Sequence, residues 1–502
     1  MNWKNLMKTA TLLFVALFAF AACSDDKEDS KPKAEDAALL TFGFYQEDNA
    51  GILSKDYIAE VPAVLATATT YNIEIPMPSV VDKSALVARF TVTEGNTIVV
   101  AGVAQVSQQT ANDFTAPVDY TVSNSDQSQN LRYTVTVTKS SNMAWTEMPF
   151  DNNIQSYDNA RLVISSKDNT PFMVYRDKED DFMKVLKYDG TSWSAVGDAS
   201  ALPKLANNYY SMDIALDGTI YVVYNDADAT NKNGLSVKKF DGSTWSFVGE
   251  QGFTKTAAQY VGIMALQNGP VAFQQNNSKN GDFPRRAIVG SVFNNGSWNS
   301  REIPADGFTG STTSSVNNGV VGYVYALNST NAKYSIVKYD ANGWSTLVSD
   351  MLQEGATHTD MIGARMAIAP DGTLYLLNCD DADENDTYRA RLLKYDDSSK
   401  TWTVVSGNSL GFNTYSSKTT SIYLDVAIAP DGTPFVVFAD NTAENVPTVV
   451  AFDNETKQWG NPVQVATVSS KLIFMKFTST GTAYMSVLDS DNHIHVYKYA
   501  EK

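Results

Sequence analysis

Short runs in which apolar and polar residues alternate fill the chain from about residue 38 to residue 140. Clear examples are the runs at 71–75, 88–92 and 133–137, in which Tyr, Ile, Phe, Thr and Val recur. Alternation with a period of two, rich in β-branched and aromatic residues, is typical of half-buried antiparallel strands. About seven such runs in roughly 100 residues predict a sandwich of two sheets over residues 38–140.

Beyond residue 140 the dominant pattern is a repeat of about 50 residues. After Trp3, the tryptophans fall at positions 145, 193, 245, 298, 344, 402 and 459. Several end the same phrase, as in Lys-Tyr-Asp-Gly-Thr-Ser-Trp at 187–193. A second phrase, Ile-Ala-x-Asp-Gly-Thr, recurs at 214–219, 368–373 and 428–433. Both phrases place a tight turn between two apolar runs, so each repeat predicts four strands joined by hairpins.

Four-stranded units at this interval are typical of β-propeller blades. Six repeats are complete. The last segment, from Leu472 to Tyr499, lacks the tryptophan phrase, whereas residues 143–146 form a fourth strand with no partners before it. We therefore expect an all-β chain with a seven-bladed β-propeller over residues 143–502, closed by pairing of the two ends of the repeat region. Six blades with unpaired ends is the alternative.

Residues 1–22 have the pattern of a secretory signal, in which two lysines precede an apolar run and two alanines. The run is too short to span a membrane as a retained helix. The following Cys23 completes a sequence, Phe-Ala-Ala-Cys, that resembles a bacterial lipobox. That resemblance implies cleavage before Cys23 and lipidation of its thiol. An ordinary secretory signal with an incidental cysteine is the alternative.

Residues 23–37 form an acidic tether that resembles the surface-export signal of lipoproteins from Bacteroides-like Gram-negative bacteria. The stretch from 113 to 135 resembles the Ig-like spacer domains of Bacteroides surface lipoproteins, which implies an Ig-like β-sandwich at 38–140. A sandwich that itself binds ligand is the alternative role. The repeated phrases resemble those of kelch and galactose-oxidase-like propellers, although the paired glycines of kelch repeats are missing. The resemblance implies an architecture and names no activity.

Charge and composition exclude several classes of protein. Lys and Arg total 38 against 56 Asp and Glu, a formal charge of −18, which opposes binding to nucleic-acid phosphates. Two cysteines rule out a disulfide framework and a cysteine-rich zinc module. The loops between the second and third strands are acidic, and Asp381 and Asp226 each begin a calcium-like spacing. Both loops end on an apolar residue where the bidentate Glu is needed, so we expect no cofactor, and calcium is not supported by the spacing.

In a propeller, the loops between the second and third strands share one face with the loops that join the blades. Aromatic side chains there suit the flat faces of sugar rings, and arginines suit the carboxylate of an acidic sugar. The alternative is that these rings pack between blades. The candidate ligand-binding residues are Tyr209, Tyr210, Phe283, Arg285, Arg286, His358, Asp383, Tyr388 and Tyr415.

We expect a lipoprotein anchored in the outer membrane through Cys23, facing the cell exterior, that binds an extracellular glycan or protein through the loop face of its propeller. A polysaccharide is the favoured ligand and an outer-membrane transporter a possible partner. Two alternatives remain open from the sequence. One is a glycoside hydrolase or lyase that uses loop carboxylates or His358, although no residue is assigned as catalytic or as a metal ligand. The other is a protein-interaction scaffold or adhesin.

Overall fold

The computed structural model describes residues 36–502 apart from a set of internal gaps. The gaps are 141, 230–232, 255, 280–281, 304–311, 329–332, 352–363, 382–387, 406–409, 411–412 and 415–422. The described residues form β-strands and a single turn of 3-10 helix, Ala199–Ala201, which confirms an all-β chain. No described helix has the length and apolar character needed to cross a membrane. The predicted signal, the tether and Cys23 lie outside the described residues.

The first ten strands form the N-terminal part of the molecule. They are β1 (Leu39–Phe44), β2 (Tyr57–Ile58), β3 (Thr70–Met77), β4 (Leu86–Val87), β5 (Arg89–Val92), β6 (Thr97–Val100), β7 (Val103–Ala104), β8 (Ala111–Asn112), β9 (Val118–Ser123) and β10 (Asn130–Lys139). One sheet has the order β2-β1-β5 and the other β3-β10-β9-β6-β7, with β4 and β8 as a separate pair.

One strand pairing differs from the sequence-based expectation of antiparallel strands. β3 and β10 run parallel over eight residue pairs, and Tyr71 stacks on its partner Tyr133 with 5.0 Å between ring centroids. Residue alternation fixes which face of a strand is buried but not its direction. The intervening residues 78–129 supply the long crossover that a parallel pair needs.

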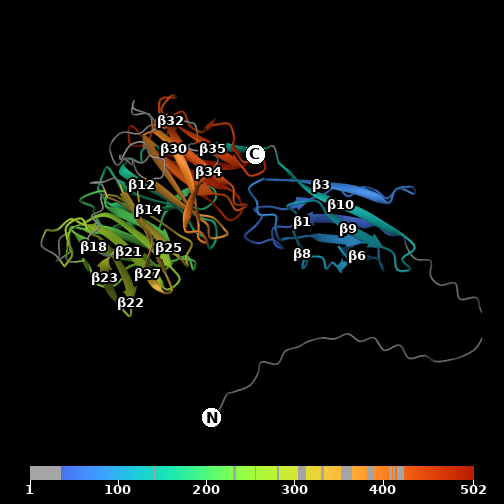
Figure 1. The fold of residues 1–502 in the computed structure, drawn as a ribbon, viewed down its shortest axis with the longest axis horizontal. Helices are drawn as coiled ribbons and strands as arrows, with labels where there is room; N and C mark the ends of the chain where they lie inside the picture. Colours follow the sequence, from blue (N-terminus) through green and yellow to red (C-terminus); the bar gives the residue numbers. More distant parts are fainter. Residues whose placement is uncertain are drawn as a thin grey trace, which may run out of the picture.

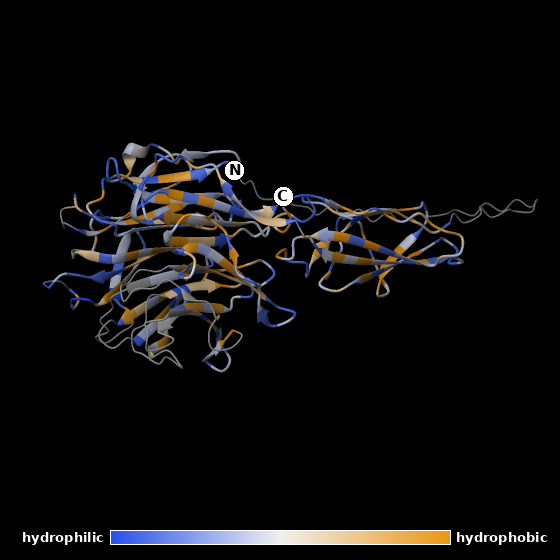
Figure 2. Ribbon diagram, turned by 90° about the horizontal axis from the view of Figure 1, so that it is seen from above, coloured by the Kyte–Doolittle hydropathy of each residue, from blue (hydrophilic) through white to orange (hydrophobic). Residues whose placement is uncertain are grey.

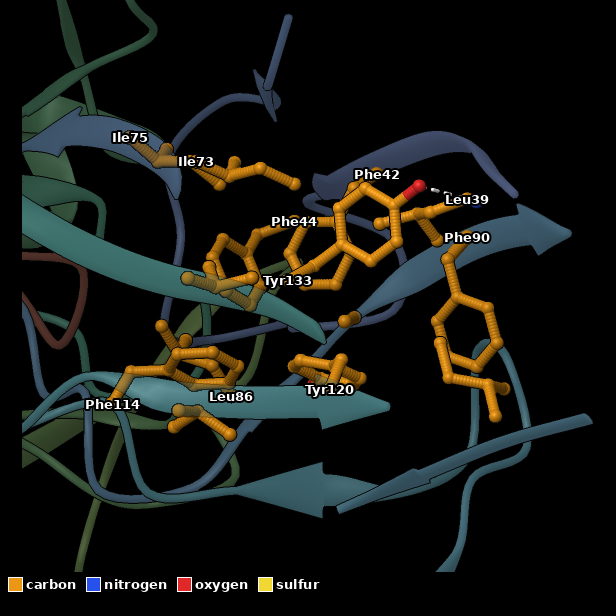
Figure 3. Packing of buried hydrophobic residues seen from close by; sticks show 14 of the residues in the cluster. Leu39, Phe42, Phe44, Ile73, Ile75, Leu86, Phe90, Phe114, Tyr120 and Tyr133 are labelled. Carbon is orange, nitrogen blue, oxygen red and sulfur yellow. Dashed lines mark hydrogen bonds between the residues drawn. The ribbon is translucent and has the colours of Figure 1, made fainter. Parts of the chain in front are cut away.

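Aromatic side chains dominate the core between these two sheets (Figure 3). Phe44 meets Phe114 edge-on at 4.7 Å, and Phe42 meets Tyr120 in the same way at 5.2 Å. The hydroxyl of Tyr133 accepts a hydrogen bond from the backbone N–H of Leu39 at 3.2 Å. The core is therefore continuous from the first strand to the last strand of this part.

The remaining strands run from residue 143 to residue 501. Those before residue 303 are β11 (Met143–Met148), β12 (Ser156–Ile164), β13 (Pro171–Asp177), β14 (Met183–Tyr188), β15 (Trp193–Ala195), β16 (Tyr210–Ile214), β17 (Ile220–Asp226), β18 (Gly234–Phe240), β19 (Trp245–Phe247), β20 (Ala258–Leu266), β21 (Gly269–Asn276), β22 (Ile288–Asn294) and β23 (Ser297–Glu302). Those after it are β24 (Thr312–Asn317), β25 (Gly322–Asn328), β26 (Lys333–Asp340), β27 (Gly343–Met351), β28 (Ala364–Ile368), β29 (Leu374–Asp381), β30 (Tyr388–Asp396), β31 (Thr401–Val404), β32 (Asn413–Thr414), β33 (Leu424–Ile428), β34 (Pro434–Asp440), β35 (Val446–Asp453), β36 (Gln458–Trp459), β37 (Val463–Gln464), β38 (Ser470–Phe477), β39 (Ala483–Asp489) and β40 (Ile494–Glu501).

Within the described residues these strands form seven antiparallel units, which we number in chain order. Units 1 to 4 are the sheets β12–β15, β16–β19, β20–β23 and β24–β27. Unit 5 (β28–β31) and unit 6 (β33–β37) belong to one ten-stranded sheet, because the short strand β32 pairs with both β30 and β34. Unit 7 joins β38–β40 to β11, whose residues Met143–Met148 pair with residues 496–501. The two ends of the repeat region therefore pair as the sequence predicts.

The units follow one another in space as they do in sequence. The first strand of each unit contacts the first strand of the next, and β38 in turn contacts β12, so the succession of contacts returns to its start. Hydrophobic clusters fill the spaces between successive sheets. The N-terminal part lies beside the repeat region, with the C-terminus near the point where they meet (Figures 1 and 2).

The repeated tryptophans hold neighbouring units together. The indole N–H of Trp298 donates to the carbonyl of Val248 in the preceding unit at 2.7 Å, and Trp245 donates to Val196 in the same way at 2.9 Å. The indole N–H of Trp344 is buried and has no hydrogen-bond partner among the described residues. Each repeat therefore places a ring against its neighbour, and in some repeats the ring also carries a hydrogen bond.

Aspartates in the repeated turns close those turns. The carboxylates of Asp241 and Asp396 accept hydrogen bonds from backbone N–H groups two and three residues later. The hydroxyls of Ser398 and Ser243 donate to the same two carboxylates. All these bonds favour the ionised form, and the pKa of each carboxyl falls to about 2. These two carboxylates therefore stabilise their turns.

We predict that Trp298→Phe destabilises the protein more than Trp344→Phe does, by about 1 kcal/mol, because only the first substitution removes a hydrogen bond to the preceding unit. Both substitutions remove the same atoms from a partly buried ring. Urea unfolding followed by fluorescence measures the two free energies of unfolding. Equal losses would mean that the bond to Val248 contributes nothing.

Candidate functional site

A cavity of about 350 Å³ lies among the first strands of the repeat units. All seven first strands, from β12 to β38, contribute to its wall. The lining extends to the last residues of several of these strands, such as Ile164, Ile368 and Ile428. The cavity therefore lies toward the turns between first and second strands, and we call it the channel.

The channel wall follows a simple register. In each of the seven units, the residue three positions before the end of the first strand lines the channel. These residues are Arg161, Ser211, Ile263, Ser314, Arg365, Asp425 and Phe474. Equivalent positions on successive strands lie at one level, so a single layer brings together residues that are far apart in the sequence.

Arg161 is the first of two arginines in this layer. Its Nε donates to Oδ1 of Asn159 at 2.9 Å, and Nη1 donates to the hydroxyl of Ser211 at 2.9 Å. Asn159 is itself fixed, because its amide donates to the carbonyl of Tyr210 at 3.1 Å. Burial is the main cause that lowers the pKa of Arg161 to about 10, and the positive charge of Arg365 lowers it further. Its hydrogen-bond partners within the described residues are neutral.

Arg365, the second arginine, faces a carboxylate without closing a hydrogen bond to it. Its Nε lies 3.8 Å from Oδ1 of Asp425, and this N–H has no hydrogen-bond partner among the described residues. The other carboxylate oxygen, Oδ2, accepts the backbone N–H of Met475 in the next unit at 2.8 Å. Burial lowers the pKa of Arg365, and Asp425 opposes that effect. Both guanidinium groups lie over the ring of Phe474, Arg365 at 4.8 Å and Arg161 at 5.9 Å from its centroid.

A second layer, one position before the end of each first strand, adds two charged residues. Asp213 accepts the backbone N–H of Ala265 at 2.6 Å and the side-chain amide of Asn317 at 2.7 Å. Burial raises the pKa of Asp213, while Lys476 in the same layer lowers it. The channel thus holds three basic groups against two carboxylates, and both carboxylates already accept hydrogen bonds from the backbone of the next unit.

The N-terminal part borders a second cavity of about 400 Å³ next to the channel. Both cavities are lined by Asn318, Ile368, Ile428 and Phe477, and the second also by Gly51, Ile52 and Asp82. Contacts between the two parts hold this arrangement. The carbonyl of Val80 accepts the backbone N–H of Asp431 at 3.3 Å, and Lys55 pairs with Glu501 at 2.7 Å.

The sequence-predicted aromatic residues divide between core and loop. Tyr210 is completely buried, and its hydroxyl accepts the backbone N–H of Arg176 at 2.8 Å, so the prediction that it presents its ring to a ligand is wrong. Tyr209 is partly buried and packs against Tyr260 at 5.6 Å. Phe283 is partly buried in the loop between β21 and β22, where its carbonyl accepts the side-chain amide of Asn276.

Arg285 and Arg286 are exposed in that same loop, away from the channel lining. Tyr388 begins β30, and its backbone pairs with Asp381 and Thr414. The remaining candidates, His358, Asp383 and Tyr415, lie outside the described residues. Of the nine predicted ligand residues, the six that the structure describes all lie outside the channel lining.

Several of the acidic loop residues have structural partners. Asp181 pairs with Arg176 at 2.6 Å, and the buried Asp226 accepts hydrogen bonds from Ser236 at 2.6 Å and Gln251 at 3.0 Å. Within the described residues, no group of three or more His, Cys, Asp or Glu side chains is placed to hold a metal ion. The acidic segment 382–387 is not among those residues.

The channel residues are absent from the sequence-based prediction, which placed the ligand-binding residues in loops. Arg161, Arg365 and Asp425 each interrupt a run of apolar residues in a first strand. A charged residue at the same register position of several repeats was the available signal.

One family model matches part of the chain. Residues 55–137 match the family model "SGBP, N-terminal". No curated protein matches the chain.

Solved structures that are similar to the chain share little sequence with it. An ulvan lyase described as a new family of polysaccharide lyase is 11% identical, with a TM-score of 0.46, over 71% of this chain and 96% of that one. A fungal alcohol oxidase in complex with copper is 13% identical, with a TM-score of 0.44, over 71% and 76%. A DUF4623 family protein from Bacteroides eggerthii is 10% identical, with a TM-score of 0.36, over 93% and 99%.

We predict that Asp425→Ala lowers the free energy of unfolding by about 2–3 kcal/mol, whereas Arg161→Met changes it by less than about 1 kcal/mol. The first substitution leaves the backbone N–H of Met475 without its acceptor and Arg365 without its nearby carboxylate. The second removes a desolvated charge that has only neutral partners. Chemical denaturation of the two variants measures both values. A large loss for Arg161→Met would assign that arginine to the fold.

Proposed function

We propose that this protein is a surface lipoprotein that binds glycans outside the cell. The observation that carries the proposal is the match of residues 55–137 to the N-terminal domain of SGBPs, a name used for Bacteroides surface glycan-binding proteins. The acidic tether after Cys23, with its resemblance to a surface-export signal, supports the same location.

The proposed architecture assigns one role to each part. Residues 38–140 form an Ig-like β-sandwich that holds the repeat region away from the membrane. Residues 143–502 form a seven-bladed β-propeller, closed where β11 pairs with β40, and the channel at its centre is the binding site. The cyclic succession of contacts between first strands supports the propeller. A volume of about 350 Å³, lined by charged groups and by the rings of Phe474 and Phe477, supports a small polar ligand.

Cys23 carries the lipid that anchors the chain in the outer membrane, facing the exterior, and an outer-membrane transporter that imports the captured glycan is its proposed partner. Asp213 and Asp425 accept backbone hydrogen bonds from the next unit, so the carboxylates of the channel are engaged by the fold, which supports binding rather than catalysis.

We predict that the chain from residue 23 onward, with Cys23→Ser to keep it free of lipid, binds at least one class of polysaccharide. Isothermal titration against a panel of plant, algal and host glycans measures binding. Reducing-end assays on the same mixtures should show no cleavage. Heat in none of the titrations would contradict the proposed function, and release of new reducing ends would favour the hydrolase or lyase alternative.

We predict that the wild-type chain is cleaved from intact cells by added proteinase, because it faces the exterior, and that Cys23→Ala releases the chain from the membrane fraction. Fractionation and immunoblotting measure both outcomes. A variant with Cys379→Ala, which changes the other cysteine of the chain, is the control and should remain in the membrane. Full protection of the wild type in intact cells would place it on the periplasmic side instead.

A further inference from the structure

The channel contains more positive charge than its own residues neutralise. An arginine side chain has five N–H donors in a planar fork. Arg161 uses two of them, on Asn159 and Ser211, and both acceptors are neutral. The Nε of Arg365 has no hydrogen-bond partner in the part of the chain that the structure describes, and the carboxylate of Asp425 lies 3.8 Å from it, beyond hydrogen-bonding distance. Two guanidinium groups with free donors therefore share one level of the channel.

The two carboxylates in the channel wall accept no hydrogen bond from these arginines. One oxygen of Asp425 accepts the backbone N–H of Met475. In the second layer, one oxygen of Asp213 accepts both the backbone N–H of Ala265 and the side-chain amide of Asn317. A partly buried guanidinium whose N–H donors lack acceptors is costly for a protein to maintain. Since no described carboxylate accepts a hydrogen bond from either guanidinium, an anion from outside the chain can serve as their partner.

The fold fixes the two guanidinium groups. Arg161 is in unit 1, Arg365 is in unit 5, and both lie over the ring of Phe474 in unit 7. Cation–π contact with one ring, together with the bond from Arg161 to Ser211, holds the two side chains at one level before any ligand arrives. This preorganisation lowers the entropic cost of binding.

We propose that Arg161 and Arg365 together bind the anionic group of an acidic sugar, a carboxylate or a sulfate ester, within the channel. This inference rests on the proposed function and names the class of glycan that the site accepts. The planar fork of each arginine suits paired hydrogen bonds to the two oxygens of such a group. Ser211, Ser314 and Asn317 in the same wall supply partners for sugar hydroxyls.

Size limits how much of the glycan enters. A volume of about 350 Å³ is at the lower end for small-molecule sites, so the channel accepts about one or two sugar units rather than a long stretch of polymer. The ligand is therefore an acidic chain end or side branch. Beyond it, the second cavity leads past Asp82 and Ile52 of the N-terminal part.

The test is titration of the full mature chain with three matched sets of oligosaccharides. The first contains uronate oligomers, the second the same oligomers with every carboxyl methyl-esterified, and the third sulfated oligomers of the same length. Wild type should bind a member of the first or third set, and should bind the methyl-esterified oligomers at least about tenfold more weakly than that member. A preference between the first and third sets identifies the anionic group as carboxylate or sulfate.

The variants assign this preference to the channel. Arg161→Met and Arg365→Met should each weaken binding of the acidic oligomer about 10- to 100-fold, and Arg161→Lys, which keeps the charge but not the fork, should lose less. Arg301→Met changes an exposed arginine on the outer strand β23 and should bind as wild type does. Arg285→Met changes a loop residue that the sequence predicted as ligand-binding, and it tests whether binding takes place at that loop instead.

The outcomes separate this inference from the proposed function. Equal binding of acidic and neutral glycans, or loss of binding in Arg285→Met with full binding in Arg161→Met and Arg365→Met, overturns the arginine site and leaves a glycan-binding protein. Binding of no glycan in any set overturns both.

Discussion

The structure depends on the common register of seven first strands. Each begins at one end of its unit and ends at a tight turn, so residues at the same distance from that turn meet at one level of the channel. The pairing of β11 with β40 ties the first repeat to the last and keeps the strands in this arrangement. Without that pairing, residues from units 1, 5 and 7 would have no reason to meet.

This register explains why the charged residues of the channel have different roles. Asp213 and Asp425 each accept a backbone N–H from the next unit, and so they connect neighbouring first strands. Arg161 and Arg365 make no comparable bond to the backbone among the described residues, and their neutral or distant partners leave donors free. The carboxylates stabilise the fold, and the arginines are available to a ligand.

Much of the architecture could be predicted from the sequence, because each structural unit corresponds to one sequence repeat. The spacing of Trp193, Trp245 and Trp298 gave the size of the unit, and the Asp-Gly turns gave the hairpins. The pairing of the two ends followed from a strand missing at one end and a strand left over at the other. The parallel pairing of β3 with β10 could not be predicted, since alternation carries no information on strand direction.

The site could not be predicted in the same way. Aromatic residues near loops, such as Tyr210, suggested a binding face, but a ring beside a strand end packs into the nearest core when one is available. Arg161 and Arg365 lie about 200 residues apart in the sequence, and only the register of the strands brings them over Phe474. The charged residues within apolar strands could be seen in the sequence. Their place in one layer of the channel could be recognised only once the end of each first strand was known.

The most direct measurement of the central claim is a crystal structure of the protein grown with an acidic oligosaccharide. We predict density for a carboxylate or sulfate in the channel, within hydrogen-bonding distance of the guanidinium groups of both Arg161 and Arg365. Ordered ligand on the loops between second and third strands, with the channel filled by water alone, would contradict the account.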